Sequence, residues 1–197
     1  ELYAHAGGGD EGVDDFTLGP VRDLPVAERL SAWRAGRAEL EAAAATLADD
    51  ARVAWYGPSM GAKSFLTARL MECWAHGQDI VDAVGADRPA TDRLRHIAQL
   101  GYITRGWTYA NRQLDMPDGE VRVVLRSPSG EEWTWGPQDA SGTVTGSAED
   151  FCLVVTQRRH VDDTELVVTG PPARDWLAKA QAFAGPPSDG PARGGSR

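Results

Sequence analysis

Apolar positions in the first 115 residues repeat at the three- and four-residue spacing of amphipathic helices. The spacing is clearest over residues 23–50, 63–84 and 91–114. In the second of these segments the apolar stripe consists of Leu66, Leu70, Cys73, Trp74, Gly77 and Ile80. Such a stripe gives a helix one face for burial, so we predict three helices. Asp23 is the predicted N-cap of the first. Residues 1–22 are rich in Gly and Asp and show little periodicity, which predicts a loop or the remnant of an upstream segment.

The pattern changes after residue 119 to that of strands and short helices. Alternating apolar and charged positions over 121–126 predict a strand, and residues 132–136 predict its partner in a hairpin. A helix is expected over 147–159, although the Val and Thr content of this segment also allows a strand. Residues 165–168 predict another strand, and 173–184 a closing amphipathic helix.

These patterns predict an α+β chain with two domains. A helical domain over 23–115 is followed by a small α/β domain over 120–185. The tail from 186 to 197 is rich in Pro, Gly and Ser and is expected to be disordered. The chain opens Glu1-Leu2-Tyr3 without an initiator Met, which favours a fragment or a processed chain.

Charge and cysteine usage exclude several partners. The formal net charge of −9 repels phosphate backbones, so no nucleic-acid partner is expected. The sequence has neither an apolar run of the roughly 20 residues that span a bilayer nor a signal-peptide pattern. Cys73 and Cys152 lie within apolar runs, as buried reduced thiols do. A cytoplasmic protein without a membrane partner is therefore expected.

A carboxylate and an imidazole four residues apart are the strongest candidate for chemistry. On a helix, Glu72 and His76 lie on one face about one turn apart, where two side chains can bind the same divalent cation. Asp79 follows three residues later and can accept a hydrogen bond from the second ring nitrogen of His76. The spacing is equally compatible with a solvated polar pair. Cys73 with His76 is a competing ligand pair, but packing of Cys73 in the core is favoured over ligation.

A second candidate is the basic cluster Arg158, Arg159 and His160 at the end of the predicted helix. Its cations suit the negative end of a helix dipole, and they are equally suited to bind a substrate carboxylate. His96 is interpreted as a surface or capping histidine.

The run from Ala68 to Ile80 resembles the metal-binding helix of the mycothiol-dependent maleylpyruvate isomerase family. Further similar segments are residues 92–96, 133–137, 151–160 and 180–187. The resemblance covers roughly residues 22–187 and is closest to an uncharacterised metal-binding branch. It implies a DinB-like helical bundle, here a partial four-helix bundle, followed by a small α/β domain of sterol-carrier type.

The resemblance also implies roles for individual residues. The Glu and His of the family's helix bind a divalent metal, usually zinc, and these roles fall on Glu72 and His76. The third ligand of the family is a His on an early helix, expected upstream of this chain, and the segment around His5 does not resemble that helix. An Arg of the second domain contributes to activity in the isomerase. Arg158 is the most similar position, with Arg159 as the alternative.

The function expected from the resemblance is a thiol-dependent transfer or isomerisation. Zinc would bind mycothiol or another low-molecular-weight thiol, and the thiolate would add to a small electrophilic substrate steadied by Arg158. Two alternatives stay open at this point: a metal-dependent hydrolase that activates water, and a metal-containing ligand-binding protein without turnover.

Overall fold

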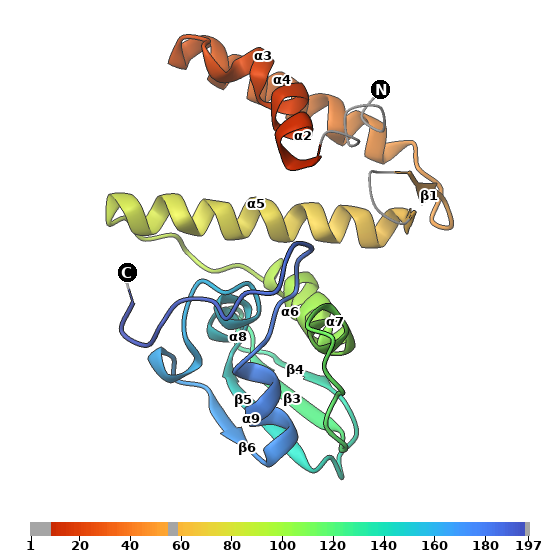
Figure 1. The fold of residues 1–197 in the computed structure, drawn as a ribbon, viewed down its shortest axis with the longest axis vertical. Helices are drawn as coiled ribbons and strands as arrows, with labels where there is room; N and C mark the ends of the chain where they lie inside the picture. Colours follow the sequence, from red (N-terminus) through yellow and green to blue (C-terminus); the bar gives the residue numbers. More distant parts are fainter. Residues whose placement is uncertain (1–8, 55–58, 196–197) are drawn as a thin grey trace. The chain divides into compact units, whose positions relative to one another are not determined.

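The structure is a computed structural model that describes residues 9–54 and 59–195 (Figure 1). Contacts divide the chain into two compact units, residues 1–66 and 67–197. The first unit contains α2 (Gly9–Thr17), α3 (Gly19–Arg22), α4 (Val26–Ala45), β1 (Arg52–Val53), β2 (Met60–Gly61) and the start of α5 (Ala62–Val84). The second contains the rest of α5, α6 (Leu94–Ile103), α7 (Arg105–Asn111), β3 (Val121–Arg126), β4 (Glu132–Trp135), β5 (Gly142–Ser147), α8 (Ala148–Val155), the short 3-10 helix η1 (Val161–Asp163), β6 (Val167–Thr169) and α9 (Pro171–Leu177). The predicted α+β class is confirmed. Among the described residues, no helix has both the length and the apolar character needed to span a membrane.

The first unit is mainly helical. The described part of residues 1–22 forms α2 and α3 where a loop was expected, and Pro20 in the first turn of α3 has the fixed φ that suits a helix start. The predicted helix over 23–50 is α4, with Pro25 rather than Asp23 at its N-cap. Residues of the expected connector between α4 and α5 form the short antiparallel pair β1–β2. Residues 1–8, including His5, lie outside the described part.

Helix α5 has the predicted extent, but its buried face differs from the predicted stripe. Met71 and Ala75 are fully buried, and Gln78 continues the same face at helical spacing. Cys73 and Ile80 are exposed, so the expectation of a buried Cys73 is wrong. The reason is geometric: the helix turns by 100° per residue, and the neighbouring elements cover the face of Met71 instead of that of Cys73. The polar residue Gln78 therefore takes an inner position.

The second unit is built on a four-stranded sheet in the order β4-β3-β5-β6. The predicted hairpin is confirmed, with Val123 opposite Trp135 and Leu125 opposite Trp133. Strand β5 was not predicted from the sequence. It pairs in parallel with β3, while β6 pairs antiparallel with β5. Its sequence, GTVTGS, holds a single apolar side chain, Val144, and this strand exists because β3 and β6 supply hydrogen-bond partners on both sides.

One core joins the sheet to the helices around it. The buried residues of β3 alternate, so one face of the strand points inward. Phe151 of α8 and Trp176 of α9 meet edge to face there, with ring centroids 5.9 Å apart. Helix α6 approaches α8 closely at Gly101, where an added Cβ would lie 2.7 Å from Val155 Cγ2.

Because α6 and α8 share this core, helices on both sides of the predicted boundary at 115–120 pack together. The contacts divide the chain at Leu66 instead, within α5. The expected helix over 91–114 is present as α6 and α7, which are separated at Thr104. There the Thr104 hydroxyl donates to Leu100 O at 2.8 Å and competes with the helical hydrogen bonds.

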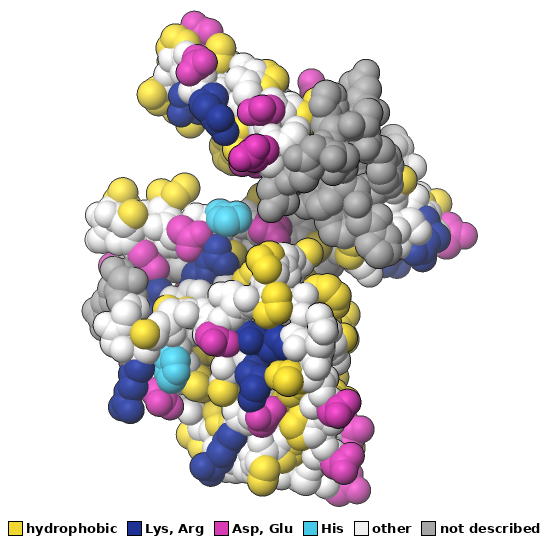
Figure 2. Space-filling view, in the orientation of Figure 1, with side chains coloured by type: hydrophobic (Ala, Val, Ile, Leu, Met, Phe, Trp, Pro, Cys, Tyr) yellow, Lys and Arg dark blue, Asp and Glu magenta, His cyan; other side chains and the backbone are white. Residues whose placement is uncertain are grey.

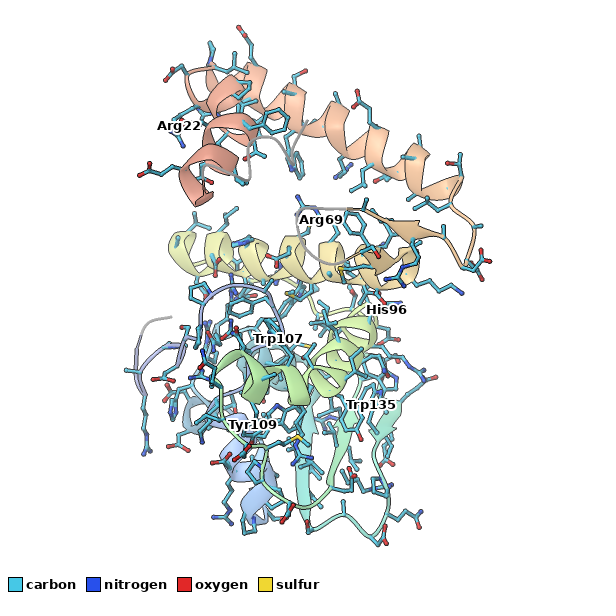
Figure 3. All side chains as sticks on the ribbon, turned by 45° about the vertical axis from the view of Figure 1, so that its right-hand side comes forward. Arg22, Arg69, His96, Trp107, Tyr109 and Trp135 are labelled. Carbon is cyan, nitrogen blue, oxygen red and sulfur yellow. The ribbon has the colours of Figure 1, made fainter. Side chains whose placement is uncertain are left out.

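The last elements hold the chain end against this core. Tyr109 of α7 donates its hydroxyl hydrogen to Asp175 of α9 at 2.8 Å (Figure 3). Helix α9 corresponds to the predicted closing helix but ends at Leu177. The described part of the predicted tail, residues 186–195, contains neither helix nor strand. It is held by hydrogen bonds, among them Arg112 Nη1 to Asp189 Oδ1 at 2.8 Å.

Candidate functional site

Helix α5 carries three of the predicted site residues in one row. His76 lies between the other two: its Nε2 is 3.3 Å from Glu72 Oε2, and its Nδ1 is 3.1 Å from Asp79 Oδ2. The His76 side chain is 68% exposed and that of Glu72 is 37% exposed. Figure 2 shows histidine, acidic and basic side chains close together at the surface of the molecule. The imidazole is thus accessible, with a carboxylate at each ring nitrogen.

Arg158 reaches the same cluster from the end of α8. Its Nε and Nη2 donate to Asp79 Oδ1 and Oδ2 at 3.0 and 2.8 Å. Its Nη1 donates to the carbonyl of Thr156 at 2.6 Å. The hydrogen bonds and charge of Arg158 lower the pKa of Asp79, with a smaller contribution from His76, so Asp79 is an ionised acceptor near neutral pH. In this structure Arg158 therefore holds Asp79, which contacts His76, and Arg158 Nη2 itself lies 3.4 Å from His76 Nδ1.

The position of Arg158 depends on how α8 ends. Ser147 accepts a hydrogen bond from Asp150 N at the first turn, so this helix begins with a side-chain cap. At the other end Gln157 adopts φ 59°, and the Gln157 and Arg158 amides bond back to the carbonyls of Val154 and Leu153. This left-handed position costs a residue other than Gly some energy. It is offset here because Gln157 Nε2 donates to Ala180 O at 3.0 Å.

A second ionic pair lies one turn further along α5. Arg159 donates from both terminal nitrogens to Asp82, at 2.8 Å each. Gln78 Nε2 also donates to Asp82 at 2.8 Å. The side chains of Arg159 and Asp82 are 17% and 22% exposed, so the pair is largely shielded from solvent. Arg158 and Arg159 thus bind successive carboxylates of α5, which fixes the end of α8 against that helix.

Arg88 lies beside the glycine that follows His76. Its Nη2 donates to Gln78 Oε1 at 2.8 Å, and its Nη1 donates to Trp74 O at 3.0 Å. An added Cβ at Gly77 would lie 2.7 Å from Arg88 Nη1. Sequence reasoning missed Gln78, Asp82 and Arg88. The available signals were a lone Gly inside a helix, which usually has a packing reason, and the four-residue spacing of Gln78 and Asp82.

The Asp82–Arg159 pair predicts a pH-dependent stability. Hydrogen bonding by Arg159, above all, lowers the pKa of Asp82 from its ordinary value. Its stabilisation is therefore complete above the unfolded carboxyl pKa, about 3.9, and is lost as the pH falls through the lower folded pKa. We expect Asp82→Asn to lower the free energy of unfolding by about 1–2 kcal/mol at pH 6. The measurement is urea unfolding of both proteins from pH 6 to 2.5.

The difference in unfolding free energy between the unchanged chain and Asp82→Asn reports on Asp82 alone, because the other carboxylates titrate in both proteins. It should shrink as the pH falls below about 4. A difference that stays constant over the whole range would show that Asp82 has the same pKa in the folded and unfolded chain.

The remaining sequence candidates lie elsewhere. His160 Nδ1 accepts from Asp162 N at 3.1 Å and caps η1. His96 is exposed on α6 (Figure 3), as predicted. Cys152 is buried, and burial raises the pKa of its thiol. Within residues 9–54 and 59–195, no group of three or more His, Cys, Asp or Glu side chains is placed so that it could hold a metal ion.

Comparison with known proteins gives two family matches in different parts of the chain. Residues 2–81 match the mycothiol maleylpyruvate isomerase N-terminal domain, and residues 117–169 match a family described as wyosine base formation. The first match includes Glu72, His76 and Asp79. The second includes Arg158. The likeness of residues 120–185 to a sterol-carrier domain stays a prediction.

Two curated relatives match nearly the whole chain. They are Uncharacterized protein MT0041 and Uncharacterized protein Rv0036c, from Mycobacterium tuberculosis strains CDC 1551 / Oshkosh and ATCC 25618 / H37Rv. Each is 46% identical over 190 residues, which is 96% of this chain and 74% of the relative. No solved structure matches the chain. Because that identity extends through both family matches and the helix of Glu72 and His76, the chain belongs to the mycothiol maleylpyruvate isomerase-like family.

Proposed function

We propose that this chain binds a divalent metal through Glu72 and His76. Zinc is the metal we propose, because imidazole nitrogen and carboxylate oxygen are common zinc ligands. The observation that carries the proposal is the 3.3 Å between His76 Nε2 and Glu72 Oε2. Two ligands at 2.0–2.2 Å from a tetrahedral zinc lie about 3.4 Å apart. The two donor atoms therefore have the separation that a shared metal requires, and both side chains are accessible to solvent.

The other ring nitrogen supports the same assignment. A metal-binding histidine usually donates its second N–H to a carboxylate, which fixes the tautomer and leaves a lone pair on the ligating nitrogen. Asp79 Oδ2 stands 3.1 Å from His76 Nδ1, and two hydrogen bonds from Arg158 hold Asp79 in turn. Asp79 would then orient His76, and Arg158 would position Asp79.

We further propose that the metal serves a thiol-dependent transfer or isomerisation. When bound, zinc would supply the charge that keeps mycothiol or another small thiol deprotonated at neutral pH. Two protein donors leave positions for a further ligand, from outside the described residues, and for the thiol. Asp79 and Thr156 accept three of the five N–H groups of Arg158, and Arg158 Nη2 also lies 3.4 Å from His76 Nδ1. The second N–H of Nη1 is then the group that can bind a substrate carboxylate or enolate.

Isothermal titration of the metal-free chain tests both parts of the proposal. Zinc is added first and mycothiol second, with S-methylated mycothiol as the control ligand. We expect one zinc per chain, and thiol binding to the zinc-loaded form alone, with proton release that the S-methylated control lacks. Zinc binding without thiol binding would overturn the thiol reaction and favour metal-dependent hydrolysis or a non-catalytic metal site. Absence of zinc binding would overturn the whole proposal.

Replacement of Asp79 tests the support of His76. We expect Asp79→Asn to weaken zinc binding about 10- to 100-fold, because loss of a carboxylate partner of a ligating histidine typically has an effect of that size. The measurement is competition with a zinc-chelating dye. The matched control is Asp139→Asn, because Asp139 is an exposed residue in the loop after β4. Equal affinities for the Asp79 and Asp139 variants would rule out the orienting role.

A further inference from the structure

A groove outside the Glu72–His76 cluster is lined by residues of α9, of β6 and of the segment from 160 to 166. Its volume is about 590 Å³, within the range of sites for small organic molecules. The lining residues are His160, Val161, Asp162, Thr164, Leu166, Val168, Arg174, Leu177, Ala178 and Arg193. Nothing in the proposed metal chemistry uses this groove.

The inner surface of the groove is apolar. Val161, Leu166 and Val168 are half-buried and pack against the core on their inner sides, so their outer sides line the groove. Leu177 of α9 is almost fully buried and lines it as well. The apolar part of a ligand bound here would be removed from water. Each CH₂ group buried in this way contributes about 0.8 kcal/mol to the binding free energy.

Basic groups line the same groove, on a chain whose net charge is −9. Acidic side chains are spread over the face that Figure 2 shows. In the groove, by contrast, Arg174 and Arg193 face a single acid, Asp162, which lies 3.6 Å from Arg193. The exposed side chain of Arg174 makes no hydrogen bond or ion pair with any described residue. Its guanidinium is therefore free to bind an anion.

His160 adds a hydrogen-bond donor to the same wall. Its Nδ1 accepts the Asp162 N–H at 3.1 Å, so Nε2 is the ring nitrogen that can donate to a ligand. The groove thus combines an apolar floor with one unpaired cation and further donors nearby. This combination suits a molecule with one anionic head and an apolar body.

We propose that the groove binds an amphipathic monocarboxylate, with its carboxylate at Arg174 and its apolar body on Val161, Leu166 and Val168. A guanidinium binds a carboxylate through two parallel hydrogen bonds, which makes a carboxylate the best fit among singly charged heads. This site is independent of Glu72 and His76, so the proposal does not rest on the metal function.

Titration of the isotope-labelled, metal-free full chain with octanoate, followed by amide NMR shifts, tests the proposal. We expect saturable shifts at Val161, Leu166 and Val168, and binding of 1-octanol at least about 10-fold weaker. Arg174→Gln should raise the octanoate Kd about 5- to 10-fold, since the positive charge and one of the two parallel hydrogen bonds are lost at an exposed position. Arg126→Gln, an exposed arginine on β3 outside the groove, is the control and should leave the Kd unchanged.

Three results would overturn the proposal. The first is a shift that does not saturate, and the second is an equal loss of affinity in the Arg174 and Arg126 variants. The third is loss of octanoate binding in His76→Ala with retention in Arg174→Gln, which would place the carboxylate near the metal cluster. Both arginines are exposed, so the variants are expected to fold, and the unchanged amide signals of the sheet check this directly.

Discussion

Replacement of His76 by Ala is expected to lower the zinc affinity of the chain by at least about 100-fold. Loss of a carboxylate that merely supports a ligating histidine already weakens binding 10- to 100-fold, so loss of the ligand itself has a larger effect. Glu72→Ala should act in the same direction, because its Oε2 is the partner donor at 3.3 Å. The measurement is competition with a zinc-chelating dye at pH 7.

The control for this experiment is His96→Ala. His96 is an exposed imidazole on α6, so its removal deletes a potential zinc ligand without touching the cluster on α5. We expect an unchanged affinity in this variant. If the His76 and His96 variants bind zinc equally well, the metal lies elsewhere in the chain. Because His76 is largely exposed, neither change should alter folding, which circular dichroism would verify.

Replacement of Trp176 by Ala is expected to lower the free energy of unfolding by about 3–5 kcal/mol. Trp176 is fully buried and meets Phe151 at 5.9 Å, so its loss leaves a cavity where α8 and α9 pack together. This packing holds α8, whose end presents Arg158 to Asp79. The measurement is urea unfolding followed by far-ultraviolet circular dichroism, which does not depend on tryptophan fluorescence.

Trp107→Ala is the matched control for size and residue type. Trp107 is 42% exposed on α7, and its Nε1 donates to Phe183 O at 3.2 Å (Figure 3). We expect a loss of about 1 kcal/mol or less, from one hydrogen bond and partial burial. A Trp176 variant no less stable than the Trp107 variant would contradict the assignment of the Phe151–Trp176 contact to the centre of the core.

Local spacing was sufficient to predict the row on α5. Residues three or four apart on a helix are neighbours whatever surrounds the helix, so Glu72, His76 and Asp79 could be placed together from the sequence. The hairpin of β3 and β4 was predictable for the same reason, since alternation and a turn are local signals. The contact between Arg158 and Asp79 joins residues 79 positions apart and was not predicted, because the sequence gives no local signal for it.

Spacing alone could not show which face of α5 is buried. The apolar stripe and the face of Met71, Ala75 and Gln78 are both compatible with a helix, and the choice is made by the elements that cover it. The prediction for Cys73 was wrong for this reason. Strand β5 was missed because its Gly and Thr residues have weak local preferences and become a strand only between β3 and β6.

The sequence by itself determined that this chain carries a carboxylate and an imidazole on one helical face, within a mixed α+β protein. These features depend on neighbours in the chain. The tertiary structure decided what supports them: Arg158 on Asp79, Arg159 on Asp82, and Arg88 beside Gly77. These contacts depend on distant segments brought together by burial of a shared core, and shielding from solvent strengthens the hydrogen bonds between Arg159 and Asp82.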